Sequence, residues 1–132
     1  APGYGYSTAV IARMAAAVIA VEPDENMAAA ASDALSALEV DNALVSQGDA
    51  AAGDPDHGPF DAIFVNVGVP GPPEALLAQL KDGGRMVAIE MSGGAGRAVV
   101  YVKTGDRVAT RRLFDAATPV APWFEADAAF AL

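Results

Sequence analysis

The 132-residue chain contains no cysteine, which excludes disulfide bridges and thiolate metal sites. Basic residues are also scarce, because eight Lys and Arg stand against 17 Asp and Glu and leave a net charge of −9 at pH 7. No basic stripe is present that could bind a nucleic-acid backbone. The longest apolar run, around Met14 to Val21, is too short to span a bilayer. We therefore expect a cytoplasmic protein with neither a nucleic-acid nor a membrane partner.

The residues that are present indicate one globular α/β domain over 1–132. Hydrophobic residues make up 53% of the chain and charged residues 19%, which is typical of a folded protein. Helical and strand patterns alternate, which predicts an open sheet with helices on both faces and a C-terminal antiparallel hairpin. The expected helices are Thr8–Ala17, starting at Ser7 or Thr8, one opening at Pro23-Asp24-Glu25, and Glu74–Leu80. The expected strands are Val18–Val21, Ala43–Ser46, Phe60–Val67, Arg85–Met91, Ala98–Lys103 and Arg107–Phe114.

Two of these segments allow more specific expectations. The second helix has apolar residues at helical spacing, so that one face should be buried: Met27, Ala30, Ala31, Ala34, Leu35 and Leu38. The Phe60–Val67 strand is apolar throughout Ala62–Val65, which predicts a central place in the sheet. The tail from Asp115 is expected to pack as irregular structure.

A glycine turn, Gly3-Tyr4-Gly5, stands directly before the first helix. Glycine allows positive φ and lets a ligand approach the backbone, and the helix N-terminus offers free N–H groups. Glu22 ends the next strand, 17 positions beyond Gly5. In doubly wound folds an acid about 20 positions on binds ribose hydroxyls. The alternatives are an ordinary tight turn and an acid that favours a helix start.

The pair Gly48-Asp49 ends the third strand segment. A carboxylate there could accept from the exocyclic amine of adenine, and the glycine would leave room for the ring; a plain turn is the alternative. The candidate cofactor-binding residues are therefore Gly3, Gly5, Glu22 and Asp49. His57 is interpreted as a solvated loop residue, and no cluster has metal-ligand spacing.

The spacing also separates two kinds of cofactor. A dinucleotide needs a helix N-terminus for its pyrophosphate, usually with a third glycine for close packing, but the third position after Gly5 is Thr8. S-adenosylmethionine has no phosphate and does not need that glycine. The pattern favours S-adenosylmethionine.

The segment from Gly3 to Ala12 resembles the Gly-x-Gly-Tyr-x-Thr-Ala-x-Leu-Ala motif of the protein-L-isoaspartate O-methyltransferases. Further similar segments follow in the family's order: Val21–Asp24, Asp41-Asn42 leading to Gly48-Asp49, Pro59–Ile63, Leu76–Arg85 and Arg112–Pro119. The resemblance implies a Rossmann-like class I S-adenosylmethionine-dependent methyltransferase sheet. It also implies methyl transfer to isoaspartyl carboxylates of damaged proteins, which are the expected substrate and partner.

The resemblance implies that four residues bind the cofactor: Gly3, Gly5, Glu22 and Asp49. It implies a catalytic role for no residue. An acceptor carboxylate with a pKa of about 4 is already ionised at neutral pH, so no strong base is required. Catalysis can then consist mostly of alignment in a dry pocket.

The chain also departs from the family pattern. The family's first strand and N-terminal region, with its acceptor-site serine, have no counterpart, and Asn66–Pro70 replaces Thr-Ala-Ala-Ala-Pro. The absent strand would lie between the Val18 and Phe60 strands, so we expect unpaired strand edges. The isolated chain is expected to be inactive, and to unfold, to aggregate or to borrow a strand from a second copy. Two alternatives remain open: a methyltransferase for another acceptor, and a non-catalytic adenosyl-binding module.

Overall fold

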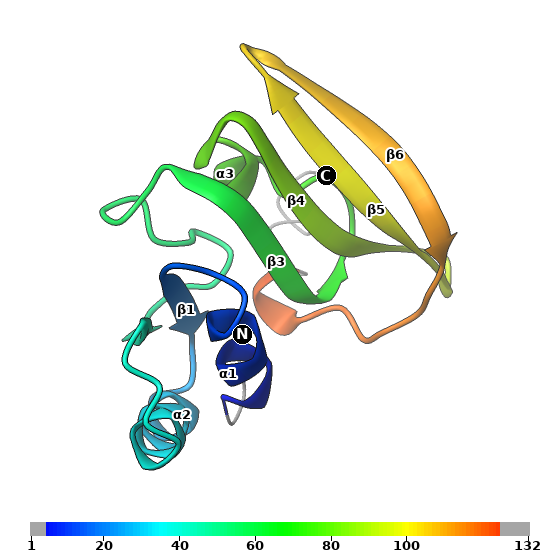
Figure 1. Ribbon diagram of the computed structural model, residues 1–132. Coiled ribbons are helices and arrows are strands. Elements are labelled where there is room, and N and C mark those ends of the chain that lie inside the picture. The colour runs from blue at the N-terminus through cyan, green and yellow to red at the C-terminus, as the bar shows by residue number, and fades with distance from the viewer. Residues whose placement is uncertain (1–4, 125–132) are drawn as a thin grey trace. The chain divides into compact units, whose positions relative to one another are not determined.

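The computed structural model describes residues 5–124 of the chain, which forms two compact units, Ala1–Asp54 and Pro55–Leu132 (Figure 1). Gly3 lies outside the described residues. No helix within 5–124 is long and apolar enough to cross a membrane. The elements in chain order are α1 (Tyr6–Ala12), β1 (Val18–Glu22), α2 (Glu25–Ala37), β2 (Ala43–Gln47), β3 (Phe60–Val69), α3 (Glu74–Leu77), β4 (Leu80–Ser92), β5 (Ala95–Thr104) and β6 (Arg107–Asp115).

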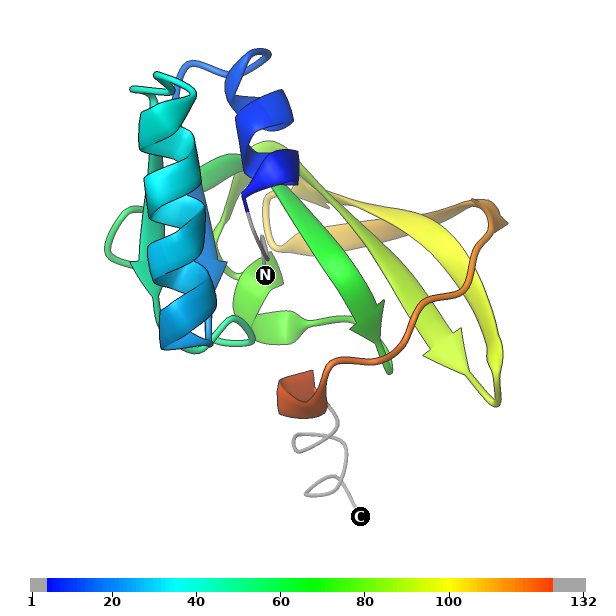
Figure 2. The same cartoon turned by 90° about the horizontal axis from the view of Figure 1, so that it is seen from below.

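The first unit is built on a parallel pair of strands. β1 and β2 run in register from Val18 opposite Ala43 to Glu22 opposite Gln47, and α2 connects them (Figures 1 and 2). α2 begins at Glu25 because the Asp24 side chain accepts the backbone N–H of Met27 at 2.9 Å. Its buried residues are Ala28, Ala31 and Leu35. The expected burial of Leu38 is wrong, because α2 ends at Ala37 and Leu38 is 61% exposed.

Helix α1 is shorter than the sequence predicts. It begins at Tyr6 rather than Ser7 or Thr8, and Gly5 occupies the N-cap position with no side-chain hydrogen bond. It ends at Ala12 instead of Ala17. The Asn42 side-chain amide donates to the carbonyls of Ala12 and Ala15 at 2.6 and 3.0 Å. Because the last carbonyls of a helix lack internal partners, this amide explains how the chain can leave the helix there.

The second unit is a four-stranded mixed sheet in the order β3-β4-β5-β6. β3 and β4 are parallel, and β5 is antiparallel to β4 and β6, so the predicted C-terminal hairpin is confirmed. Its largest fully buried side chains come from three strands: Tyr101, Leu80, Met86, Val69 and Val99. The helix expected over Glu74–Leu80 ends at Leu77, because Leu80 already belongs to β4.

Strand β3 is at an edge of its sheet, so the predicted central position is wrong. Its apolar stretch is partly exposed, and Phe64 is 55% exposed. Among the described residues no strand hydrogen-bonds to both β1 and β3, and these strands belong to separate sheets. An apolar run indicates a strand that other surfaces can cover, but it does not reveal whether a neighbouring strand is present.

The segment that follows β6 is bound to the sheet at two glycines. The backbone N–H of Ala116 donates to the carbonyl of Gly96 at 3.1 Å, and that of Gly68 donates to Pro119 at 3.0 Å. A Cβ atom at Gly68 would lie 2.9 Å from the carbonyl oxygens of Thr118 and Pro119. The segment 116–121 is otherwise irregular, as expected, and Val120 forms a β-bridge with Gly68. The part of the tail beyond Phe124 lies outside the described residues.

Candidate functional site

Glu22 lies at the carboxyl end of β1, as predicted. Glu22 is only 3% exposed, and its carboxylate Oε1 accepts a hydrogen bond from the backbone N–H of Asp24 at 3.1 Å. Its carbonyl accepts the N–H of Gly48 at 3.1 Å, which joins the end of β1 to the residue after β2. A carboxylate has lone pairs for several hydrogen bonds. Glu22 is thus a buried acceptor, held in place by the start of α2.

Gly48 and Asp49 follow β2 directly, so the structure brings them beside Glu22 at the carboxyl edge of the parallel pair. Asp49 is exposed, and its Oδ1 accepts the N–H of Ala51 at 2.9 Å. A Cβ atom at Gly48 would meet nothing within 4 Å. Gly48 therefore leaves open space where a side chain would stand, and the next residue carries an exposed carboxylate.

Gly5 has two structural reasons to be glycine. Its φ is +89°, and a Cβ atom there would lie 3.2 Å from the carbonyl oxygen and 3.3 Å from the Cα of Ala31. A side chain would be strained and would push against α2. The close approach of α1 and α2 therefore depends on this glycine, whether or not a ligand also approaches it.

These residues define what the first unit can bind. Ligands of open α/β sheets lie beyond the carboxyl ends of the strands, and Glu22 and Asp49 are both at that edge. Two carboxylates suit hydroxyl and amine donors and do not suit a phosphate. Among residues 5–124 no group of three or more His, Cys, Asp or Glu is placed to hold a metal ion. His57 is exposed.

The second unit has a groove of about 930 Å³ at the carboxyl end of its own parallel pair. One wall is the segment Pro70–Pro72, which follows β3. The other walls are the end of β4, the start of β5, the last part of β6 and the segment that follows it: Glu90–Ser92, Gly94–Arg97, Arg112 and Asp115–Ala117. The groove therefore lies where the general rule for α/β sheets places a ligand.

A charged cluster stands on one wall of this groove. The Glu90 carboxylate accepts the Tyr101 hydroxyl at Oε1, and its Oε2 lies 3.8 Å from the Nε of Arg97. The Glu90 side chain is 16% exposed, and Tyr101 is fully buried. Burial, followed by the hydrogen bond to Glu90 and its charge, raises the pKa of the Tyr101 phenol well above its usual range. The phenol therefore remains a donor at working pH.

Sequence reasoning missed this cluster. The signal was Glu90, a charged residue directly after the apolar run Met86–Ile89, followed by Arg97 across a short glycine-rich turn. The register confirms that Glu90 and Arg97 are direct cross-strand partners.

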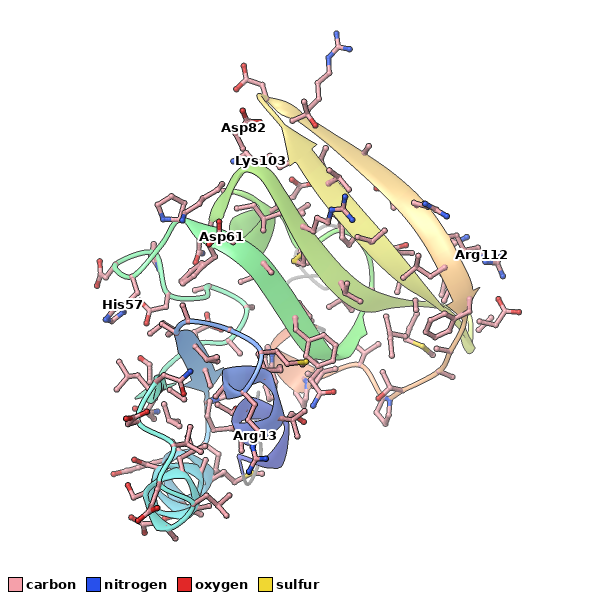
Figure 3. The ribbon with its side chains drawn as sticks, viewed as in Figure 1. Arg13, His57, Asp61, Asp82, Lys103 and Arg112 are labelled. Atoms are coloured by element: carbon pink, nitrogen blue, oxygen red, sulfur yellow. The ribbon has the colours of Figure 1, made fainter. Side chains whose placement is uncertain are left out.

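The charged residues at the amino end of β4 have structural partners. Lys81 forms an ion pair with Asp61 at 3.3 Å, and Asp82 accepts the N–H of Gly105 at 2.8 Å. Lys103 donates to the carbonyl of Leu80 at 3.1 Å. Figure 3 shows Asp61, Asp82 and Lys103 toward one end of this sheet and Arg112 near the other end of β6. The two ends of the sheet thus hold different sets of charges.

Comparison with known proteins yields one consistent group of relatives. Residues 1–117 match the family model of protein-L-isoaspartate(D-aspartate) O-methyltransferase. A protein-L-isoaspartate O-methyltransferase of Roseiflexus castenholzii is 40% identical over 114 residues, which is 86% of this chain and 52% of that protein. The corresponding enzyme 1 of Syntrophobacter fumaroxidans is 39% identical over 103 residues, covering 78% of this chain and 48% of that protein.

Two solved structures with this name also superpose on the chain. A protein-L-isoaspartate O-methyltransferase superposes with a TM-score of 0.83 at 28% identity, covering 90% of this chain and 39% of that one. A putative enzyme of this type from Plasmodium falciparum, in complex with S-adenosyl-L-homocysteine, has a TM-score of 0.67 at 18% identity. That match covers 79% of this chain and 51% of that one, and supports the fold alone. The chain spans about half the length of the curated relatives it matches.

Proposed function

Because this chain belongs to the protein-L-isoaspartate(D-aspartate) O-methyltransferase family, we propose that it serves methyl transfer from S-adenosylmethionine to isoaspartyl carboxylates of damaged proteins. The observation that carries the proposal is the convergence of Glu22 and Gly48-Asp49 at one strand edge. In this proposal residues 1–132 act as one cofactor-binding domain in the cytoplasm.

Glu22 and Asp49 divide the recognition of the cofactor between them. Glu22 accepts hydrogen bonds from the ribose hydroxyls, and its burial strengthens those bonds because little water competes for the carboxylate. Asp49 accepts from the adenine amine, with the open space beside Gly48 available to the ring. Gly5 supports the site by letting α1 approach α2, and Gly3 belongs to the same predicted turn.

Methyl transfer requires these side chains to bind and orient the reactants and requires no general base among them. S-adenosylmethionine, when bound, supplies a methyl group on a cationic sulfonium. The acceptor carboxylate is ionised at neutral pH and needs no general base. The residues of this chain then hold the donor, orient the acceptor and exclude water. No side chain is assigned a catalytic role.

Cofactor binding tests the role of Glu22. The protein, expressed from its complete reading frame, would be titrated with S-adenosylhomocysteine in a calorimeter. Glu22→Gln should weaken binding by about 1–3 kcal/mol through lost charge-assisted hydrogen bonds. Glu25→Gln is the matched control, since Glu25 is an exposed residue in the first turn of α2. An unchanged affinity for Glu22→Gln would remove this residue from the site.

Methyl transfer is measured separately with tritiated S-adenosylmethionine and an isoaspartyl peptide. Transfer to this peptide and not to its aspartyl isomer supports the proposal. Ligand binding without transfer would favour the non-catalytic module, and transfer only to other acceptors would favour the other methyltransferase.

The open strand edges lead us to expect different behaviour from the isolated 132-residue chain. Within residues 5–124, β1 pairs only with β2, and β3 has β4 on one side and a single bridge at Gly68 on the other. Open edges of this kind can pair with other strands. We propose that the isolated chain is inactive and self-associates; a monodisperse monomer in light scattering that binds the ligand would contradict this.

A further inference from the structure

Two arginines reach the groove of the second unit from neighbouring strands. Arg97 lies on β5 and Arg112 on β6, and their side chains are 49% and 59% exposed. Both line the groove. Each is anchored by a carboxylate of its own, Arg97 by Glu90 and Arg112 by Asp115.

The anchoring of Arg97 leaves most of its donors available to a ligand. Glu90 approaches through the Nε atom of Arg97, which carries only one of the five N–H groups of a guanidinium. Glu90 is itself held by the buried Tyr101 hydroxyl. Met86, the cross-strand partner of Tyr101, and Glu90 lie on the same face of β4, with Ala88 between them. The small side chain of Ala88 leaves space for the Tyr101 phenol to reach Glu90. Arg97 is therefore oriented by two residues that are more buried than itself.

The charge of the surroundings makes this pair of guanidiniums distinctive. The chain has a net charge of −9, which repels acidic ligands from the protein as a whole. The groove is lined by these two arginines and by their partners Glu90 and Asp115, so its formal charges balance. The guanidinium N–H groups that those partners leave unused match a carboxylate in geometry, so an acidic side chain is a ligand group that this groove can bind.

We propose that Arg97, together with Arg112, selects acceptor peptides that carry an acidic side chain beside the modified residue. This selectivity rests on the proposed methyl transfer to isoaspartyl peptides, and it assigns the groove to the flanking residues of the acceptor. Glu90 and Tyr101 are positioning residues, because they act through Arg97.

The experiment compares peptides that differ at one flanking position. Isoaspartyl hexapeptides with blocked termini would carry Glu, Gln or Lys next to the acceptor. For the unmodified protein, KM should be lowest for the Glu peptide and highest for the Lys peptide, with similar kcat values. Arg97→Gln should raise KM for the Glu peptide about fivefold, in line with loss of a part-exposed charge-assisted contact, and leave the Gln peptide unchanged.

Two variants separate charge from structure. Arg97→Lys keeps the positive charge and should recover part of the preference for the Glu peptide. Arg107→Gln is the control, because Arg107 is exposed at the opposite end of β6 and lies outside the groove. An equal loss on the Glu and Gln peptides would overturn the proposal, since Arg97 would then contact the acceptor carboxylate or support the fold. Unchanged preference in Arg97→Gln would overturn it as well.

Two further measurements are needed. One tests whether the groove binds a side-chain or a C-terminal carboxylate, and the other measures peptide binding independently of the proposed methyl transfer. A Gln peptide with a free C-terminus is also compared with the blocked Glu peptide. If its KM is as low, the groove binds the C-terminal carboxylate of a chain, and the side-chain proposal is overturned. Fluorescence anisotropy with the same labelled peptides reports binding without catalysis. A preference for Glu that disappears in Arg97→Gln supports the selectivity even where no methyl transfer occurs; binding without preference contradicts it.

Discussion

The two units of the chain carry very different charges. Residues Ala1–Asp54 hold one basic side chain, Arg13, against eight acidic ones, for a net charge of −7. Residues Pro55–Leu132 hold seven basic against nine acidic side chains, for −2. The proposed cationic donor would thus be attracted more strongly by the first unit, and the proposed anionic acceptor would be repelled less by the second. The proposed reaction requires both kinds of ligand.

Their cores differ as well. The buried residues of the first unit are mainly alanines, with Leu35 as the largest apolar one. The second unit buries Tyr101, Leu80 and Met86. Because buried apolar area is the main source of stability, the second unit should be the more stable of the two. Low local stability is typical of elements that must adapt to a ligand.

The largest expected effect is on the core of the second unit. Met86→Ala should lower its free energy of unfolding by about 2–5 kcal/mol, because Met86 is 0% exposed and its removal leaves a cavity. Amide hydrogen exchange in β4 and β5 measures the loss. Met14→Ala in the first unit is the control, since Met14 is 77% exposed and should change stability by less than about 0.5 kcal/mol. Similar losses for both variants would show that the burial of Met86 is not what stabilises the second unit.

Local patterns predicted the strands and the hairpin well, because apolar runs and glycine turns report on nearby residues. Glu22 and Asp49 could be assigned to one edge since each follows an apolar strand. The edge position of β3 depends on a neighbour that no property of its own residues encodes. The cluster of Glu90 with Tyr101 depends on register across a turn and on the length of a phenol, which spacing along the chain does not express.

The second prediction concerns the pH dependence of the second unit. The folded-state pKa of Tyr101 is raised above its ordinary value of about 10. The folded state therefore holds this proton more tightly, so its stabilising effect is complete below pH 10 and is lost as the pH rises further. Stability should fall by up to about 1.4 kcal/mol per pH unit above pH 10. Chemical denaturation at pH 8 and pH 11 measures this loss.

Tyr101→Phe is the variant that isolates this group. At pH 8 it should cost about 1–3 kcal/mol, because the nearly buried Glu90 carboxylate loses a donor. Between pH 8 and pH 11 it should lose less stability than the unmodified protein, since lysines contribute equally to both. Equal losses over this range would show that Tyr101 does not hold its proton more tightly when folded.

The smallest expected effect compares one glycine from each unit. Gly5 and Gly83 both have positive φ, +89° and +80°, so alanine should cost about 1–2 kcal/mol of backbone strain at either position. Only at Gly5 does a new Cβ meet a neighbour, the backbone of Ala31, whereas at Gly83 it meets nothing within 4 Å. Gly5→Ala should therefore lose more protection in hydrogen exchange, in α1 and α2, than Gly83→Ala loses around β4. It should also weaken S-adenosylhomocysteine binding, which Gly83→Ala should leave unchanged. Equal costs would mean that α2 moves aside freely, and the close approach of the helices would then not be what requires glycine at this position.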